Sequence, residues 1–145
     1  MSMRVTTKTI YALQLLLALA DRARVSKSPI QLREIAESYN LPFKFLEQIA
    51  ISLKSAGWIH GQRGKEGGYI LAVSANKLSL GEVIRLLEGE STGLKIQAST
   101  AEEDAIEFVL SRCRTAIDQI VNSTTISDLL ADVHSRKPAD FDYNI

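Results

Sequence analysis

The segment GQRGKEGGYIL, residues 61–71, constrains the fold of this chain more than any other stretch, because it sets four glycines ahead of an apolar run. Short runs at residues 58–62 and 69–72 predict two strands. Glycine adopts positive φ without steric cost, as the tip of a tight β-hairpin requires. The glycines expected at that tip are Gly64, Gly67 and Gly68. The segment therefore predicts a two-stranded hairpin directly after residue 57.

A glycine-rich segment with a lysine also suggests a phosphate-binding loop. The nucleotide P-loop needs Gly-x-x-x-x-Gly-Lys-Ser/Thr between a strand and a helix, with the hydroxyl on magnesium. Here Gly64-Lys65 is followed by Glu66, and a strand rather than a helix comes next. A dinucleotide fingerprint needs the same strand–turn–helix order and is excluded for the same reason. The hairpin remains, with Arg63 and Lys65 projecting from its tip; taken alone, it is as well explained as a solvated turn.

Three helices are predicted ahead of the hairpin, over residues 7–23, 32–38 and about 42–57. Asn40 suits the left-handed terminus of the second helix, and Gly57 suits the end of the third. Pro42 fits the first position of the third helix, because it has no N–H to lose there. The expected inward stripes are Ile10, Leu13, Leu16, Leu17 and Ala20 on the first helix, and Phe45, Leu46, Ile49, Ala50 and Leu53 on the third.

The opposite face of the third helix carries long hydrogen-bonding side chains. Lys44, Glu47 and Gln48 lie at helical spacing near its N-terminus. On this helix alone an ordinary solvated face explains the pattern. However, a helix-turn-helix followed at once by a basic-tipped hairpin is a winged helix, whose third helix enters the major groove of DNA while the wing reaches a neighbouring groove. The combination therefore predicts double-stranded DNA as a partner.

Charge is divided unevenly along the chain. Its formal net charge is zero, from 17 Lys and Arg against 17 Asp and Glu. Residues 1–70 carry ten basic and five acidic residues, whereas residues 71–145 carry seven and twelve. This division indicates that only the first half approaches a polyanion, although chance segregation would give the same count.

Three capping boxes predict the helices that follow the hairpin. They are Ser79 with Glu82, Thr100 with Glu103, and Thr125 with Asp128. The first opens a helix to about residue 88, the second a long helix to about residue 122, and the third a short last helix. Apolar side chains of the long helix recur at spacings of four and three, which is typical of a helix that packs lengthwise on a partner. These residues, expected at a dimer interface, are Ile106, Leu110, Cys113, Ile117 and Ile120.

The predicted fold is mainly α with a small β-hairpin wing. Residues 1–89 form a winged helix-turn-helix domain for DNA binding, and residues 90–145 hold a linker loop, a long C-terminal dimerisation helix and a short last helix. The N-terminal apolar run is interrupted by Gln14 and spans only about ten residues, short of the roughly 20 needed to cross a bilayer. We therefore expect a cytoplasmic protein with no membrane partner.

The chain resembles the Rrf-type bacterial transcription regulators, the group of IscR, NsrR and CymR. The resemblance is carried by MRVTTKTIYAL, LREIAE, LPFKFLEQI, LKSAGWI, RGKEGGYIL and SLGEVIRLLEG, with a weaker continuation at TTISDLL. It implies a homodimeric regulator with a winged helix for DNA and a long helix for dimerisation.

The resemblance also implies roles for individual residues. Glu47 and Gln48 match positions that read base edges, where Glu accepts from cytosine and Gln pairs with adenine. Arg63 matches a wing arginine that enters the minor groove. Lys44 has two open roles, a base contact or a phosphate contact. The residues that match a backbone-contacting entry to the first helix are Arg4, Thr6, Thr7 and Lys8.

The chain departs from the best-known members of this family, which hold an iron–sulfur cluster through three cysteines ahead of the dimerisation helix. The corresponding stretch, GESTGLKIQASTAEED, has none, and Cys113 is the one cysteine of the sequence. We therefore expect no cofactor and no metal site. The acids at 102, 103, 104 and 107 are explained by the helix dipole rather than by a metal. Cys113 is expected as an apolar interface side chain, with a redox sensor as the alternative.

These features predict a sequence-specific DNA-binding repressor that acts as a homodimer on a pseudo-palindromic operator, without the three-cysteine cluster. The alternative is a CymR-like interaction protein, whose DNA binding is controlled by docking of a metabolic enzyme or a small-molecule effector. An enzyme is not expected, because the sequence shows no nucleophile–base arrangement, no metal-ligand spacing and no intact phosphate loop.

Overall fold

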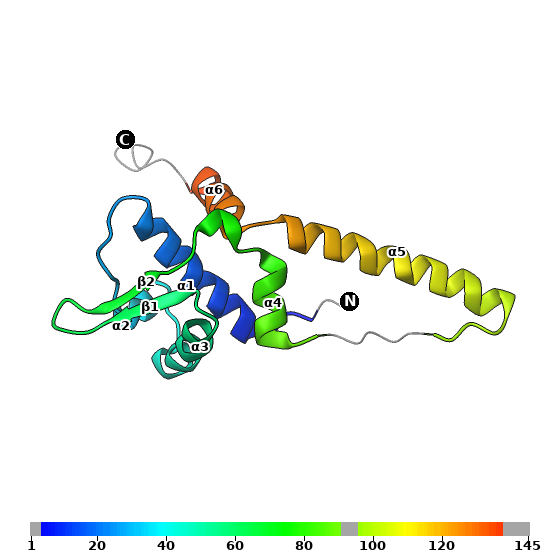
Figure 1. The fold of residues 1–145 in the computed structure, drawn as a ribbon, viewed down its shortest axis with the longest axis horizontal. Helices are drawn as coiled ribbons and strands as arrows, with labels where there is room; N and C mark the ends of the chain where they lie inside the picture. The colour runs from blue at the N-terminus through cyan, green and yellow to red at the C-terminus, as the bar shows by residue number, and fades with distance from the viewer. Residues whose placement is uncertain (1–3, 91–95, 138–145) are drawn as a thin grey trace.

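The computed structural model describes residues 4–90 and 96–137. Its elements, in chain order, are α1 (Thr7–Ala23), α2 (Leu32–Ser38), α3 (Phe43–Ser55), β1 (Ile59–Gln62), β2 (Gly68–Leu71), the 3-10 helix η1 (Ala75–Lys77), α4 (Leu80–Glu88), α5 (Ala101–Ser123) and α6 (Ile126–Arg136). Figure 1 shows a compact part made of α1 to α4, the hairpin and α6, from which α5 projects as a long arm. We call the compact part the body. The mainly α winged-helix architecture predicted from the sequence is confirmed.

Helix α1 runs through the centre of the body and packs against α3, α4, α6 and β2. Its fully buried leucines include Leu15, Leu16 and Leu19. The stripe predicted for this helix was partly wrong, because Ile10 is 45% exposed and Leu13 and Leu17 are only half-buried. A helix that is covered on several sides is apolar around most of its circumference, so a single periodic stripe does not identify its buried face.

Helix α3 buries the predicted stripe against α1 and α2, with Leu46, Ile49, Ala50 and Leu53 all buried. Phe45 is half-buried, and its ring stands edge-on to Tyr11 with 5.7 Å between the ring centroids.

The turns on either side of α3 follow the sequence with one correction. Asn40 has φ 53° and Gly57 has φ 81°, as predicted for left-handed helix ends. Pro42 is the N-cap in an extended conformation rather than the first helical residue, so α3 begins one position later than expected.

Strands β1 and β2 pair antiparallel, with Ile59 opposite Leu71 and Gln62 opposite Gly68. Gly64 and Gly68 have positive φ, of 112° and 146°. The prediction that Gly67 also needs positive φ was wrong. Its requirement is steric, because a Cβ on Gly67 would lie 2.3 Å from the carbonyl oxygen of Gln62.

A third segment holds the hairpin to the body. Ile30, just ahead of α2, forms a bridge with Tyr69 of β2 through N–H···O bonds of 3.0 and 2.8 Å. A Cβ on Gly68 would lie 2.4 Å from the Ile30 carbonyl oxygen, so this close approach requires glycine. The hairpin therefore has a fixed position relative to the start of α2.

Two of the three predicted capping boxes are complete. Ser79 with Glu82 and Thr125 with Asp128 each exchange both hydrogen bonds, at 2.9–3.1 Å. At α5 the box is half-formed, because Thr100 Oγ1 accepts from the Glu103 N–H while the Glu103 carboxylate accepts from Ser99 N instead. The carboxylate reaches one residue further back than the sequence pattern implied.

The C-terminal end of α5 returns to the body beside the start of α4. Leu80 N donates to Thr124 O at 2.7 Å and Ile126 N donates to Leu78 O at 2.9 Å, so the start of α4 is bonded to the end of α5. Helix α6 then packs on α1 and η1, and Ile126 and Leu130 join the same core as α1. No helix among the described residues is long and apolar enough to cross a membrane.

Candidate nucleic-acid interface

The outer face of α3 presents the side chains that the sequence assigned to base reading. Lys44, Glu47 and Gln48 are all exposed, although Leu46 and Ile49 beside them are buried. The contrast arises because α3 packs one side against α1 and α2, which leaves the opposite side free. In Figure 1, α3 lies along the lower edge of the body, close to the hairpin. The outer face of α3 is therefore exposed to solvent.

An isoleucine extends the same face. Ile51 follows Glu47 and Gln48 by four and three residues and is 65% exposed. Its methyl groups therefore stand in solvent among hydrogen-bonding side chains.

Arg33 is a cation next to the outer face of α3 to which the sequence assigned no role. It is exposed on α2, and its guanidinium carbon lies 4.4 Å from the centroid of the Phe43 ring at the start of α3. This cation–π contact positions the charge of Arg33 beside the outer face of α3. A single arginine on a seven-residue helix gives no periodic signal, although the first helix of a helix-turn-helix is expected to cross the DNA backbone.

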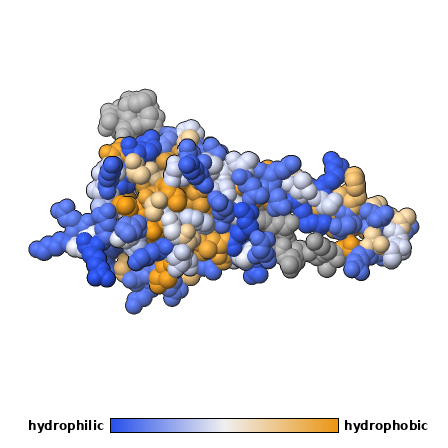
Figure 2. Space-filling model, in the orientation of Figure 1, coloured by the Kyte–Doolittle hydropathy of each residue, from blue (hydrophilic) through white to orange (hydrophobic). Residues whose placement is uncertain are grey.

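Arg63 and Lys65 are exposed at the hairpin tip, as predicted. The tip is tied to the neighbouring helix, because Gln31 Nε2 donates to Lys65 O at 3.4 Å in addition to the Ile30–Tyr69 bridge. Figure 2 shows that the protruding hairpin tip is hydrophilic. The backbone of the hairpin is therefore bonded to the segment that starts α2, and the two cations project from it into solvent.

Three of the four N-terminal residues predicted to contact the DNA backbone are exposed, and the fourth is hydrogen-bonded within the protein. Arg4, Thr7 and Lys8 are exposed, but Thr6 is half-buried and bound to Glu88 at the end of α4. Thr6 N donates to Oε2 at 3.1 Å and Thr6 Oγ1 donates to Oε1 at 2.7 Å. The Thr6 hydroxyl holds the pKa of Glu88 below its ordinary value, with a smaller contribution from the charge of Lys8. Thr6 therefore joins α1 to α4 and has its donors occupied.

The α5 arm exposes most of its apolar side chains. Of the residues predicted at a dimer interface, Ile106, Leu110 and Ile120 are 52%, 37% and 63% exposed, Cys113 is exposed and Ile117 is half-buried. Phe108 and Val109 are exposed as well, by 63% and 55%, and lie outside the predicted seam. Residues that recur at spacings of four and three form a single narrow stripe along a helix. The exposed apolar surface of α5 is wider than that stripe.

Two acids of α5 have side-chain partners within the helix or at its start. Glu103 is bound to Ser99, and Glu107 forms an ion pair with Arg114. Among the described residues there is no group of three or more His, Cys, Asp or Glu side chains placed to hold a metal ion.

The combination of an exposed third helix, an anchored wing and a projecting helix matches a known family. The Rrf2 family model, described as an iron-dependent transcriptional regulator, matches residues 5–132. The chain belongs to the Rrf2 family. It is 33% identical to the HTH-type transcriptional regulator CymR of Bacillus subtilis strain 168 over 127 residues, which cover 88% of this chain and 89% of CymR.

Solved structures of Rrf2 regulators agree with this assignment. The structure of CymR, the global cysteine regulator of B. subtilis, has a TM-score of 0.79 and 30% identity, and the match covers 90% of this chain and 98% of that one. The structure of IscR from T. potens has a TM-score of 0.74 and 29% identity, with 98% and 97% covered. The chain is thus a transcriptional regulator that binds DNA, and its family is not one of enzymes.

The iron dependence in the Rrf2 description raises the question of a cluster in this chain. Protein iron–sulfur clusters are held chiefly by several cysteine thiolates at fixed spacing. This chain has one cysteine, Cys113, which is exposed on the α5 arm. Its donor set does not fit a three-cysteine cluster.

Proposed function

We propose that this Rrf2 regulator is a homodimer that represses transcription by binding a pseudo-palindromic operator. The observation that carries the proposal is the outer face of α3, where Lys44, Glu47 and Gln48 are exposed beside a wing anchored to α2. In a winged helix, that face is the one that meets base edges in the major groove.

Each side chain of the face has a chemistry suited to a base or a phosphate. The Glu47 carboxylate accepts a hydrogen bond from the amino group of cytosine, and Gln48 pairs bidentately with adenine. Ile51 offers an apolar contact to a thymine methyl group. Lys44 lies at the N-terminal end of the face, within reach of either a guanine edge or a phosphate.

Positive groups around α3 set the position of the protein on the duplex. Arg63 enters the minor groove, where a narrow groove concentrates negative potential. Lys65, Arg33 and the entry to α1 contact phosphates, which fix register without reading sequence. At that entry Arg4, Thr7 and Lys8 supply the contacts, whereas Thr6 acts indirectly by holding α1 on Glu88.

Dimerisation is supported by the apolar surface of α5. An exposed helix of 23 residues with a broad apolar surface gains most of its stability from packing against a partner. A two-fold pairing of α5 arms buries Ile106, Leu110, Cys113, Ile117 and Ile120 against a second copy. The same symmetry sets the two α3 helices in successive major grooves, roughly 34 Å apart along the duplex.

Regulation in this protein operates without the three-cysteine cluster. The single thiol of Cys113 belongs to the apolar surface of α5 and is covered in the dimer. The signal is therefore a small molecule or a protein partner. The CymR-like alternative, control by a docked metabolic enzyme, is favoured by the acidic balance of residues 71–145.

Selection of bound duplexes from a random pool, with the purified protein prepared aerobically and anaerobically, tests the proposal. We expect one two-fold symmetric site under both conditions, and an affinity that falls steeply with salt as Lys and Arg contacts release counterions. Enrichment of an asymmetric site, or of none, would contradict the proposal. A pull-down from lysate with and without competitor DNA separates the docking alternative.

A further inference from the structure

A hollow lies between the C-terminal end of α1 and the wing, on residues that the DNA interface does not use. Its volume is about 270 Å³. The walls come from three parts of the chain: α1, the loop that follows it, and the two strands. The lining residues are Leu19, Arg22, Ala23, Ser26, Lys27, Ser28, Gln62, Tyr69, Ile70 and Leu71.

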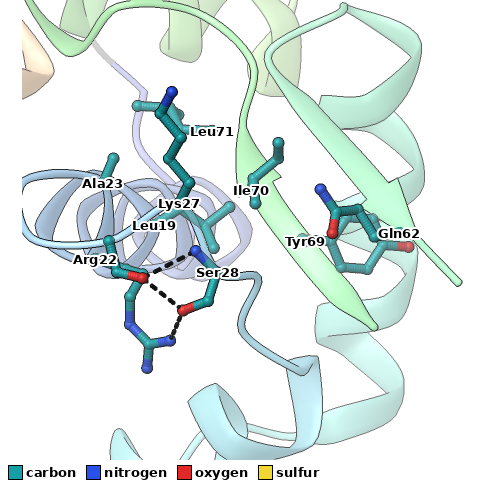
Figure 3. Close-up of a pocket in the computed structure, with 10 residues that line it drawn as sticks. Leu19, Arg22, Ala23, Lys27, Ser28, Gln62, Tyr69, Ile70 and Leu71 are labelled. Carbon is teal, nitrogen blue, oxygen red and sulfur yellow. Dashed lines mark hydrogen bonds between the residues drawn. The ribbon is translucent and has the colours of Figure 1, made fainter. Parts of the chain in front are cut away.

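Half of this lining is apolar or aromatic. Figure 3 shows Leu19 of α1 facing Ile70 of β2 across the hollow. Ile70 and Leu71 are only half-buried, so the chain itself leaves part of their apolar surface uncovered. In the corresponding region, Figure 2 shows hydrophobic surface between α1 and the hairpin, surrounded by hydrophilic surface. A ligand with a short apolar body would cover these side chains.

The polar part of the lining carries positive charge and no acid. Arg22 donates to Ser28 Oγ at 3.0 Å and lies 3.8 Å from Glu34, so its charge is partly engaged. Lys27 forms no ion pair within residues 4–90 and 96–137. Asp21 precedes Arg22 in the chain, but its carboxylate is engaged elsewhere. Its Oδ1 lies 2.9 Å from His134 Nε2 and 3.4 Å from Arg24 Nε. Lys27 is therefore the cation free to meet an anion at this hollow.

We propose that the hollow is an effector site for a small carboxylic acid with a short branched or aromatic apolar body. The apolar body packs between Leu19 and Ile70, and the carboxylate pairs with Lys27. The volume lies just below the about 300–1,000 Å³ of ordinary ligand pockets, which suits a small acid.

The site is coupled to DNA binding through the wing. Tyr69, Ile70 and Leu71 of the lining belong to β2, and Gln62 directly precedes the wing arginine. A ligand that contacts both α1 and β2 favours one position of the wing relative to α3. It changes DNA affinity by the ratio of its own affinities for the free and DNA-bound forms. This coupling rests on the proposed DNA-binding mode, whereas ligand binding itself does not.

Methyl-labelled full-length protein, titrated with isovalerate and with phenylacetate, tests the site without DNA. We expect saturable NMR shifts at the methyls of Leu19, Ile70 and Leu71. Isovaleramide lacks the charge and acetate lacks the apolar body, so each should bind at least about tenfold more weakly. No saturable shift at these methyls with either acid, or equal binding of isovaleramide, would overturn the proposal.

Variants locate the charge and the cavity. Lys27→Gln should weaken binding of the acid at least about tenfold, whereas Arg24→Gln, on the same loop but outside the hollow, should leave it unchanged. Ala23→Phe fills the hollow from an exposed position and should abolish binding, with Ala131→Phe on α6 as its control. If Ala23→Phe fails to fold, the comparison of Lys27→Gln with Arg24→Gln decides alone. Equal effects of Lys27→Gln and Arg24→Gln would reject the assignment.

Fluorescence anisotropy with the selected operator tests the coupling. The acid should shift DNA affinity of the unchanged protein but not of Ala23→Phe. If the acid binds the hollow but does not change DNA affinity, the proposed coupling to DNA binding is overturned, whereas the ligand site stands. Failure of any DNA to bind would instead contradict the proposed function, since the NMR titration stands independently of it.

Discussion

In the body, Leu15, Leu16 and Leu19 of α1 are buried to 1% exposure or less, whereas α5 buries one residue of its 23, Val121. Both helices carry many apolar side chains, although α1 is the more apolar of the two. The body surrounds α1 with four other elements, and α5 leaves the body at its base and meets no other element along most of its length. The contrast shows that the body is held by its own contacts, whereas the arm leaves its apolar surface exposed; in the proposed homodimer a second copy covers that surface.

A charge on the arm gives the strongest test of this contrast. Leu110→Asp would bury a carboxylate at the proposed interface in both copies, and we expect the dimer dissociation constant to rise about a thousandfold. Val25→Asp, a change at a 78% exposed apolar residue of the body, should leave the dimer intact. Analytical ultracentrifugation measures both. A Leu110→Asp protein that remains dimeric would remove α5 from the interface.

A cavity in the body should behave differently from one in the arm. Leu16 is fully buried, so Leu16→Ala should lower the free energy of unfolding by about 3 kcal/mol at any protein concentration. Leu110→Ala weakens association, so its loss of melting temperature relative to the unchanged protein should vary with protein concentration, whereas the loss in Leu16→Ala should not. Thermal unfolding over a dilution series distinguishes the two. Equal concentration dependence would contradict the separation of body and arm.

The recognition face should carry specificity with little effect on stability. Glu47→Ala removes one base contact, so we expect discrimination at one position of each half-site to fall by about 2 kcal/mol. Glu37→Ala, an exposed acid on α2, is the matched control. Binding to single-base operator variants measures the change. A site preference that survives Glu47→Ala untouched would refute the assignment of this side chain.

The wing should contribute affinity more than sequence preference. Arg63→Ala is expected to reduce the slope of log affinity against log salt by about one, and to weaken binding mainly at A·T-rich flanks. Lys77→Ala, at an exposed lysine of η1 away from the wing, serves as control. Anisotropy at several salt concentrations provides the slope. An unchanged slope would place Arg63 away from the duplex.

The Thr6–Glu88 contact gives the smallest expected effect and depends on pH. Hydrogen bonding lowers the pKa of Glu88 from its ordinary value of 4.5. Its contribution to stability is therefore present above that ordinary value and is lost as pH falls through the folded-state pKa. Glu88→Gln should flatten the acid side of the stability curve slightly, whereas Glu37→Gln should not. Identical melting curves of both variants down to acidic pH would argue against this role.

Local signals in the sequence predicted most of the fold. The hairpin, α2 and the bounds of α1 followed from glycines, caps and helical spacing, because each of these acts within a few residues. Two complete capping boxes did so for the same reason. The exposure of Lys44, Glu47 and Gln48 followed from the same periodicity that buried Leu46 and Ile49.

The features that the sequence did not reveal involve residues far apart in the chain. Thr6 and Glu88 are 82 positions apart, and nothing near either residue indicates the other. The cation–π contact of Arg33 and the hollow beside the wing depend on how three elements meet. The offset of the α1 stripe has the same origin, since the neighbours of a central helix decide which of its apolar residues are covered.

The two backbone bonds that join the start of α4 to the end of α5 have a mechanical consequence. They attach the C-terminal end of α5 to the start of α4, so the arm is bonded to the body at the end where the chain returns from it. Helices α4 and α6 both pack on α1, so the orientation of α5 is transmitted to the whole body. In the proposed homodimer, the crossing angle of the two α5 helices would therefore set the spacing of the two α3 helices.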